Sequence, residues 1–176
     1  MIRSRRLALG LGLSLAVIAA DQISKWWIVE HMMNPPRVIP VAPFFNLVMG
    51  WNRGVSFGLF NWDLAAAAWV LSGLALVIVA VLLAWMAKEE RATTIAALGL
   101  VIGGALGNVI DRVRFGAVAD FLDFHAFGFH WPAFNAADTA ISLGALALVA
   151  DALFARPDLP KNSHNAPDGP GKKPEP

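Results

Sequence analysis

The chain has 176 residues, of which 57% are hydrophobic and only 15% are charged, and its mean hydropathy is +0.56. This apolar share exceeds that of an ordinary soluble domain, so we expect a membrane protein. A formal net charge of +1 argues against a general nucleic-acid-binding surface. The absence of cysteine excludes disulfides, thiolate metal sites and a cysteine nucleophile.

Four apolar stretches predict an all-α polytopic membrane protein with four transmembrane helices, because a helix that crosses a bilayer needs about 20 mostly apolar residues. The basic and then apolar start of the chain also resembles a cleavable signal peptide. We nevertheless expect a retained first span, since the apolar stretch continues past Asp21 to Ile28 and three more follow. The predicted spans cover about residues 7–28, 64–87, 94–112 and 136–154.

Residues from about 34 to 63 predict a small extracytoplasmic lobe, because four prolines precede β-forming residues mixed with Gly and Asn. Residues 157–176 are rich in Pro, Gly, Asn, Asp and Lys, and this composition predicts a disordered tail. Nine of the fourteen Lys and Arg residues fall on the side that holds both termini, so the positive-inside rule places both termini and the tail in the cytoplasm. Residues 1–156 would form one membrane-embedded domain.

Small residues recur every four positions in the last two predicted spans. Such residues let helix backbones approach closely where lipid offers no hydrophobic driving force. We therefore expect these two spans to pack together, so that the end of one meets the start of the other. The residues concerned are Gly99, Gly103 and Gly107 in the third span, and Ala136, Ala140 and Gly144 in the fourth.

Four acidic residues, Asp111, Asp120, Asp123 and Asp138, lie near the boundary of the last two spans, where ionisable groups are costly and usually functional. Asp120 lies among aromatic and aliphatic residues, and such surroundings raise a carboxyl pKa. Asp138 lies in the first turn of the fourth span, where the helix dipole stabilises an ionised carboxylate. An ordinary capping arrangement with Asn135 explains Asp138 equally well. If Asp120 and Asp138 meet, they suit a carboxylate dyad that activates water.

Polar residues near these acids have two readings each. One helix face carries Asn108, Asp111 and Arg112. Asp111 either pairs locally with Arg112 or takes part in the site. The forked guanidinium of Arg112 also suits a substrate carbonyl or a phosphate. Asn52, followed by Gly54, forms either a turn or a contact to a substrate backbone.

Three other constellations are weaker. Asp21 and Lys25 are four residues apart, and mutual pairing is their simplest account, because a catalytic Ser24–Lys25 pair would point about 100° apart on a helix. The G-x-S-x-G match at residues 54–58 lacks the strand-to-helix elbow that this motif needs. A metal site from His125, His130, Asp120 and Asp123 fits no specific template.

Five segments together closely resemble the prolipoprotein signal peptidase family, signal peptidase II, which comprises bacterial intramembrane aspartyl peptidases. Each segment alone is weakly specific, but all five occur in family order, and their joint occurrence is highly specific. The segments are DQISK at 21–25, NRGVSF at 52–57, GGALGNVIDR at 103–112, GAVADF at 116–121 and FNAADTAI at 134–141.

The resemblance implies a β-like cradle and an amphipathic stretch over an active site near the periplasmic face of the inner membrane, with both termini cytoplasmic. The catalytic pair maps onto Asp120 and Asp138, which would use water and no metal or cofactor to cut diacylglyceryl-modified prolipoproteins just before the lipidated cysteine. Inhibition by globomycin-type antibiotics and a monomeric state among membrane lipids are also expected. Positions that bind substrate or support the site map onto Asn52, Gly54, Asn108, Asp111, Arg112, Asn135, Asp21 and Lys25.

The chain departs from the family pattern at Arg53 and Val55, where small or polar residues are commoner, and the tail after Pro157 has no counterpart. The alternative function is that of a small transporter whose carboxylates bind protons or cations. In such a protein the acidic residues would lie near the middle of the membrane. Asp120 and Asp138 instead lie at one boundary, beside a lobe that suits an extended peptide. This placement favours the peptidase.

Overall fold

The computed structural model describes residues 2–54 and 64–154. Within these ranges, four helices are long and apolar enough to cross a membrane, which confirms the predicted architecture. The π-helical segment η1, Ile28–Met32, extends the first helix by five residues beyond Trp27. The helices are α1 (Ile2–Trp27), α2 (Leu64–Met86), α3 (Ala92–Phe115) and α4 (Ala136–Phe154).

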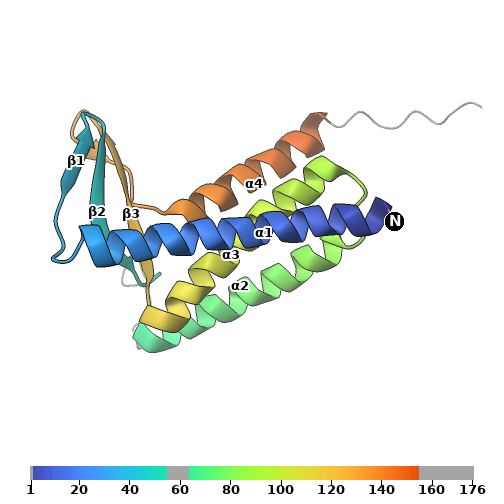
Figure 1. The fold of residues 1–176 in the computed structure, drawn as a ribbon, viewed down its shortest axis with the longest axis horizontal. Helices are drawn as coiled ribbons and strands as arrows, with labels where there is room; N and C mark the ends of the chain where they lie inside the picture. The colour runs from blue at the N-terminus through green and yellow to red at the C-terminus, as the bar shows by residue number, and fades with distance from the viewer. Residues whose placement is uncertain (1, 55–63, 155–176) are drawn as a thin grey trace, which may run out of the picture.

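Helix α3 lies at the centre of the bundle, with α1, α2 and α4 around it (Figure 1). Of its most apolar window, 61% is buried, whereas the other three helices bury only 17–22% of theirs. A hydrophobic cluster at one end of the bundle contains Met86 of α2 and Ile95, Leu98 and Ile102 of α3. The helix that carries the third predicted span is therefore the scaffold against which the others are positioned.

Small residues allow the helices around α3 to come within backbone contact. A Cβ built on Gly144 of α4 would lie 2.7 Å from the carbonyl oxygen of Ala97, and one on Gly104 would lie 2.4 Å from that of Ala137. The predicted close packing of α3 on α4 is therefore confirmed. The prediction that all the small residues of the third span face the fourth was partly wrong. Gly99 and Gly103 face α1, where a Cβ on either would lie 2.7 Å from a backbone oxygen.

A four-stranded antiparallel sheet, counted over the described residues, crosses the end of the bundle opposite the N-terminus (Figure 1). Its order is β1–β2–β3–β4. Strands β1 and β2 fall inside the predicted lobe of residues 34–63, whose residues 55–63 lie outside the described ranges. The strands are β1 (Ile39–Ala42), β2 (Phe45–Asn52), β3 (Val118–Ala126) and β4 (Phe129–His130). We call residues 33–54 and 117–134 the sheet lobe.

The third strand comes from a distant part of the chain, between α3 and α4. Helix α3 ends at Gly116, whose left-handed φ of 69° closes the helix with a bond from its N–H to the Arg112 carbonyl. The chain then enters β3, where Asp120 lies opposite Gly50 and Val118 lies opposite Asn52. This pairing carries Asp120 across the end of the bundle and toward the start of α4.

Candidate active site

Asp120 lies on β3 with only 3% of its surface exposed. Its Oδ1 accepts a hydrogen bond of 2.7 Å from the side-chain amide of Asn135. Burial raises the pKa of Asp120 to about 6, the hydrogen bond from Asn52 lowers it, and the nearby charge of Asp138 raises it further. Asp120 therefore holds its proton at pH values where an exposed aspartate has lost it.

Asp138 occupies the first turn of α4 and forms a reciprocal cap with Asn135. The Asn135 side-chain oxygen accepts a bond of 2.9 Å from the Asp138 N–H, and the Asn135 N–H donates over 3.3 Å to Asp138 Oδ2. The capping arrangement predicted from the sequence is therefore present. It does not compete with a role in the site, because the same Asn135 side chain also bonds Asp120. A single buried asparagine thus connects the two carboxyl groups.

Asn108 of α3 bridges this pair to a second polar group. Its amide donates to Asp138 Oδ1 over 2.8 Å. Its oxygen accepts from Asn135 over 3.2 Å and from the Lys25 ammonium over 3.1 Å. Because both ends of the amide are engaged, its orientation is fixed, and the ionised form of Asp138 receives a donor.

Lys25 of α1 is 3% exposed and lies between two buried carboxylates. Its Nζ is 2.9 Å from Asp21 Oδ2 and 2.8 Å from Asp111 Oδ2. Asp21 Oδ1 also accepts from the Ala137 N–H at 2.9 Å, an otherwise unpaired donor at the start of α4. The predicted Asp21–Lys25 pair is confirmed, and it is also the junction that holds α1, α3 and α4 together.

Asp111 pairs with Lys25 and forms no direct ion pair with its neighbour Arg112, so the local Asp111–Arg112 pair, one of the two readings of Asp111, was wrong. Its Oδ2 also accepts from the Ala119 N–H over 3.1 Å, which fixes the start of β3. Arg112 instead lies near Asp138, its Nη1 is 3.5 Å from the Asn108 carbonyl oxygen, and its Nε is buried without a hydrogen-bond partner.

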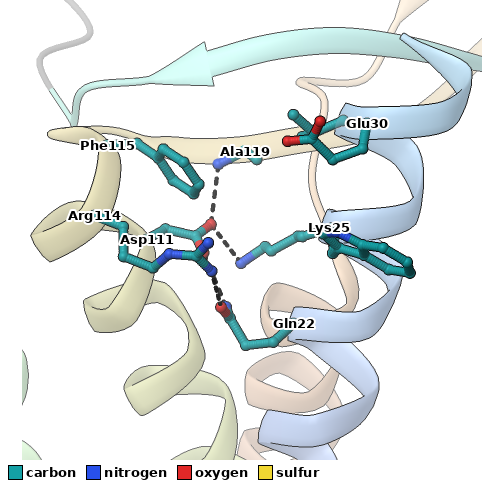
Figure 2. Close-up of a pocket in the computed structure, with 9 residues that line it drawn as sticks. Gln22, Lys25, Glu30, Asp111, Arg114, Phe115 and Ala119 are labelled. Carbon is teal, nitrogen blue, oxygen red and sulfur yellow. Dashed lines mark hydrogen bonds and ion pairs between the residues drawn. The ribbon is translucent and has the colours of Figure 1, made fainter. Parts of the chain in front are cut away.

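Figure 2 shows Lys25 and Gln22 of α1 pointing toward Asp111 of α3, around a small pocket. Gln22 donates to Asp111 Oδ1 over 2.9 Å. The pocket has a volume of about 20 Å³, enough for about one water molecule. Neither Asp120 nor Asp138 lines it, so it lies behind the carboxylate pair and belongs to its support.

A larger groove of about 430 Å³ reaches Asp138 itself. Its lining is mainly apolar and comes from the segment before α4 and from the outward face of that helix. This groove, unlike the small pocket, has the size and position to receive part of a ligand beside a carboxylate. Its residues are Trp131, Pro132, Ala133, Phe134, Asp138, Thr139, Ser142 and Leu143.

Asn52 and Gly54 lie at the end of β2, where the Asn52 side-chain oxygen accepts from the Gly54 N–H over 2.8 Å. The predicted turn is therefore present. Gly54 has a φ of +75°, which favours glycine. Asn52 also reaches the site, because its side chain bonds Asp120. Asn52 therefore both forms the turn with Gly54 and lies beside Asp120.

Asp123, another of the four acids, does not join the pair, because it lies on the opposite face of β3 from Asp120, an odd number of residues away. Burial raises the pKa of Asp123, but hydrogen bonds from Asn46 at 3.0 Å and from His130 at 2.9 Å outweigh it, so the pKa is lowered overall. Among the described residues, no three His, Asp or Glu side chains are placed to hold a metal ion.

Sequence reasoning missed two features of the site. Gln22 was not singled out as a supporting residue, although its place one residue after Asp21 at the end of a span was a usable signal. The backbone donors of Ala119 and Ala137, which bond Asp111 and Asp21, carry no sequence signal at all.

For Ser24, the hydroxyl donates to the Asp21 carbonyl over 2.8 Å, so it is engaged in its own helix and not with Lys25.

Comparison with known proteins identifies the family of the chain. The family model described as signal peptidase (SPase) II matches residues 13–154. A lipoprotein signal peptidase from Methylobacterium sp. (strain 4-46) is 41% identical over 151 residues, which is 85% of this chain and 92% of the relative. One from Azoarcus sp. (strain BH72) is 48% identical over 136 residues, 76% of each chain.

A solved structure extends the likeness to the fold. A bacterial membrane enzyme determined at 1.9 Å superposes with a TM-score of 0.73 at 27% identity, covering 84% of this chain and 94% of that one. Membership of the family makes this a multi-pass bacterial membrane protein and an aspartic-type protease. The chain belongs to the signal peptidase II family.

Proposed function

We propose that this protein removes the signal peptide from diacylglyceryl-modified prolipoproteins, cutting just before the lipidated cysteine, with Asp120 and Asp138 as the groups that activate water. Family membership supports the coarser part, signal peptide cleavage from prolipoproteins. The role of the two aspartates is supported by the side-chain amide of Asn135, which contacts both residues. It donates to Asp120 at 2.7 Å and accepts from the Asp138 N–H at 2.9 Å.

The two carboxyl groups have the unlike surroundings that hydrolysis by a dyad requires. Asp120 is buried and retains a proton up to about pH 6, whereas the half-buried Asp138 accepts hydrogen bonds from Asn108 and from the Asn135 N–H. The ionised carboxylate takes a proton from water while the protonated one donates a hydrogen bond to the scissile carbonyl. The water oxygen bonds to the carbonyl carbon, and a carboxyl proton passes to the leaving nitrogen as the C–N bond breaks. The protons belong to the pair as a unit.

The supporting residues have distinct proposed roles. Asn108 and Asn135 orient the carboxyl groups, and Lys25, Asp21 and Asp111 fix Asn108 from behind. Polar contacts to the extended peptide come from Asn52 and Gly54, at and just after the end of β2, and from the guanidinium of Arg112, whose Nε has no hydrogen-bond partner in the protein. The apolar groove beside Asp138 accommodates part of the substrate's apolar surface.

The orientation proposed for the molecule follows from charge. Basic residues gather at the bundle end that holds the N-terminus and the α2–α3 connection, so this end faces the cytoplasm and the sheet lobe faces the periplasm. Residues 1–156 act as one domain. The predicted tail at 157–176 lies outside the described residues.

The function is tested with purified protein in lipid nanodiscs that carry no ion gradient. A diacylglyceryl-modified prolipoprotein should be cleaved, and mass spectrometry should locate the cut just before the lipidated cysteine. The same precursor without lipid serves as the control and should be cleaved much more slowly. Globomycin should block the reaction and a chelator should leave its rate unchanged. Absence of cleavage, or a cut elsewhere, would contradict the proposal.

A further inference from the structure

The turn between β3 and β4 carries a concentration of exposed aromatic side chains. Phe127 is fully exposed, and Phe129 and Trp131 are 67% and 62% exposed. Residues 124–134 contain no Asp, Glu, Lys or Arg. We call residues 124–131 the aromatic hairpin. An apolar surface of this kind in a water-facing position needs a partner.

The backbone at the hairpin tip makes Phe127 an unexpected choice. Phe127 has a φ of +52° and Gly128 a φ of +79°, so both turn residues adopt left-handed conformations. Two-residue hairpin turns with this pattern favour Asn-Gly, and a bulky residue there is strained. Packing within the protein does not offset this backbone strain, because the Phe127 side chain is fully exposed. Its exposed ring is therefore available for a contact outside the protein.

The base of the hairpin packs against the sheet, so the tip projects from a fixed base. The Phe124 ring stacks on Phe45 with centroids 4.8 Å apart and on Phe134 at 5.8 Å. His130 Nδ1 lies 2.9 Å from the buried Asp123 carboxylate. These contacts anchor both strands of the hairpin to the sheet.

The surroundings of the hairpin favour lipid as the outside partner. The strands run across the end of the bundle, and the β3–β4 turn lies at the same end as the outer end of α1 (Figure 1), which carries the half-exposed Trp26 and Trp27. Tryptophans at the end of a span mark the membrane interface. The groove that contains Trp131 also contains Leu143, and so continues onto the exposed apolar face of α4.

We propose that the aromatic hairpin inserts into the membrane interface at the sheet-lobe end, with the rings of Phe127 and Trp131 at the boundary between headgroups and acyl chains. Aromatic rings favour this depth, and the lack of charge in the segment removes the main cost of entry. The contact tethers the sheet lobe to the bilayer beside the entrance to the Asp138 groove. It is independent of the chemistry proposed for the two carboxylates.

The absence of cysteine from the chain allows a direct test, because a single introduced cysteine accepts one environment-sensitive fluorophore. Labels are placed in three variants, Phe127→Cys, Leu146→Cys and Arg37→Cys, each in phosphatidylethanolamine–phosphatidylglycerol vesicles with or without brominated acyl chains. Leu146, on the exposed face of α4, is the lipid control, and the exposed Arg37 of the sheet lobe is the aqueous control. Circular dichroism and a melting curve verify that each variant is folded.

The label at position 127 should be quenched by brominated lipid to at least about half the extent of the label at 146, while the label at 37 is quenched by aqueous iodide alone. A label at 127 that behaves like the one at 37 would overturn the proposal. Shielding that appears only after prolipoprotein is added would also overturn it, in favour of a substrate contact.

A second variant separates insertion from folding. Phe127→Asn suits the left-handed turn, so the folded state should be retained or stabilised. A label on Phe129→Cys should then lose about half or more of its quenching by brominated lipid when Phe127→Asn is added. Unchanged quenching would contradict the role of Phe127 as an anchor.

Discussion

At the scale of single residues, the proposed active site depends on the contrast between two aspartates. Asp120 is 3% exposed and its pKa is raised to about 6, chiefly by burial. A raised carboxyl pKa is itself a destabilising feature when the group is ionised, because the folded state then keeps a charge that water would solvate better. The geometry that suits Asp120 to chemistry should therefore reduce the stability of the protein at neutral pH.

Replacing Asp120 with Asn should stabilise the protein while abolishing activity. Because the folded pKa lies above the unfolded value, the carboxyl favours folding at low pH, and this contribution is lost as pH rises through about 6. Above that pH the wild type bears a cost of at most about 3 kcal/mol, which the Asp120→Asn variant avoids. Thermal melting at pH 5 and pH 8 should show a gain that grows with pH. A gain independent of pH would contradict this origin.

Asn52→Ala should move the alkaline limit of activity to higher pH. The Asn52 hydrogen bond lowers the pKa of Asp120, so its loss raises that pKa and keeps the pair singly protonated at higher pH. The measurement is the pH profile of kcat/KM. The control is Asn46→Ala, which removes a bond to Asp123 at 3.0 Å and should leave the limit in place. A shift in the opposite direction for Asn52→Ala would refute the assignment.

At the scale of elements, α3 is the scaffold, and its contacts are of two kinds. Glycines at backbone contact hold α3 close to α1 and α4. Lys25, buried between Asp21 and Asp111, joins the ends of α1 and α3 and the start of α4, where the Asp21 carboxylate accepts from the Ala137 N–H. Both kinds of contact set the position of Asp138 relative to Asp120.

Gly144→Ala should destabilise the bundle. The added Cβ would lie 2.7 Å from the Ala97 carbonyl oxygen, which is backbone and cannot rotate away. We expect a loss of roughly 1–3 kcal/mol. Gly73→Ala in α2, where nothing lies within 4 Å, is the matched control and should stabilise its helix by about 0.5–1 kcal/mol. Equal effects at both positions, measured by unfolding in detergent, would argue against the α3–α4 contact.

Lys25→Met should cost about 3–5 kcal/mol, because it leaves two buried carboxylates without their cation. The double variant Lys25→Met, Asp111→Asn removes one of those charges. It should recover part of the stability, and the recovery measures the coupling between the two residues. A double variant less stable than Lys25→Met would mean that Asp111 acts mainly through Gln22 and the Ala119 N–H.

At the scale of the whole molecule, the sequence predicted what depends on local pattern. The four spans follow from runs of apolar residues. The local surroundings of Asp120 and Asp138 distinguish these two acids from the others. The pairing of β2 with β3 joins residues about seventy positions apart, and no local period reports it. The same limit explains why the sequence leaves the partner of Asp111 open, because that partner, Lys25, comes from another helix.

We propose that Asp120 and Asp138 together perform the hydrolysis, and three conservative variants test this proposal. Asp120→Asn, Asp138→Asn and the matched control Asp123→Asn are compared for cleavage of a diacylglyceryl-modified prolipoprotein by the purified, folded proteins. Asp123 lies on the same strand as Asp120 but bonds Asn46 and His130 on the opposite face. We expect no detectable cleavage with the first two variants and substantial cleavage with the third. Full activity of either Asp120→Asn or Asp138→Asn would contradict it.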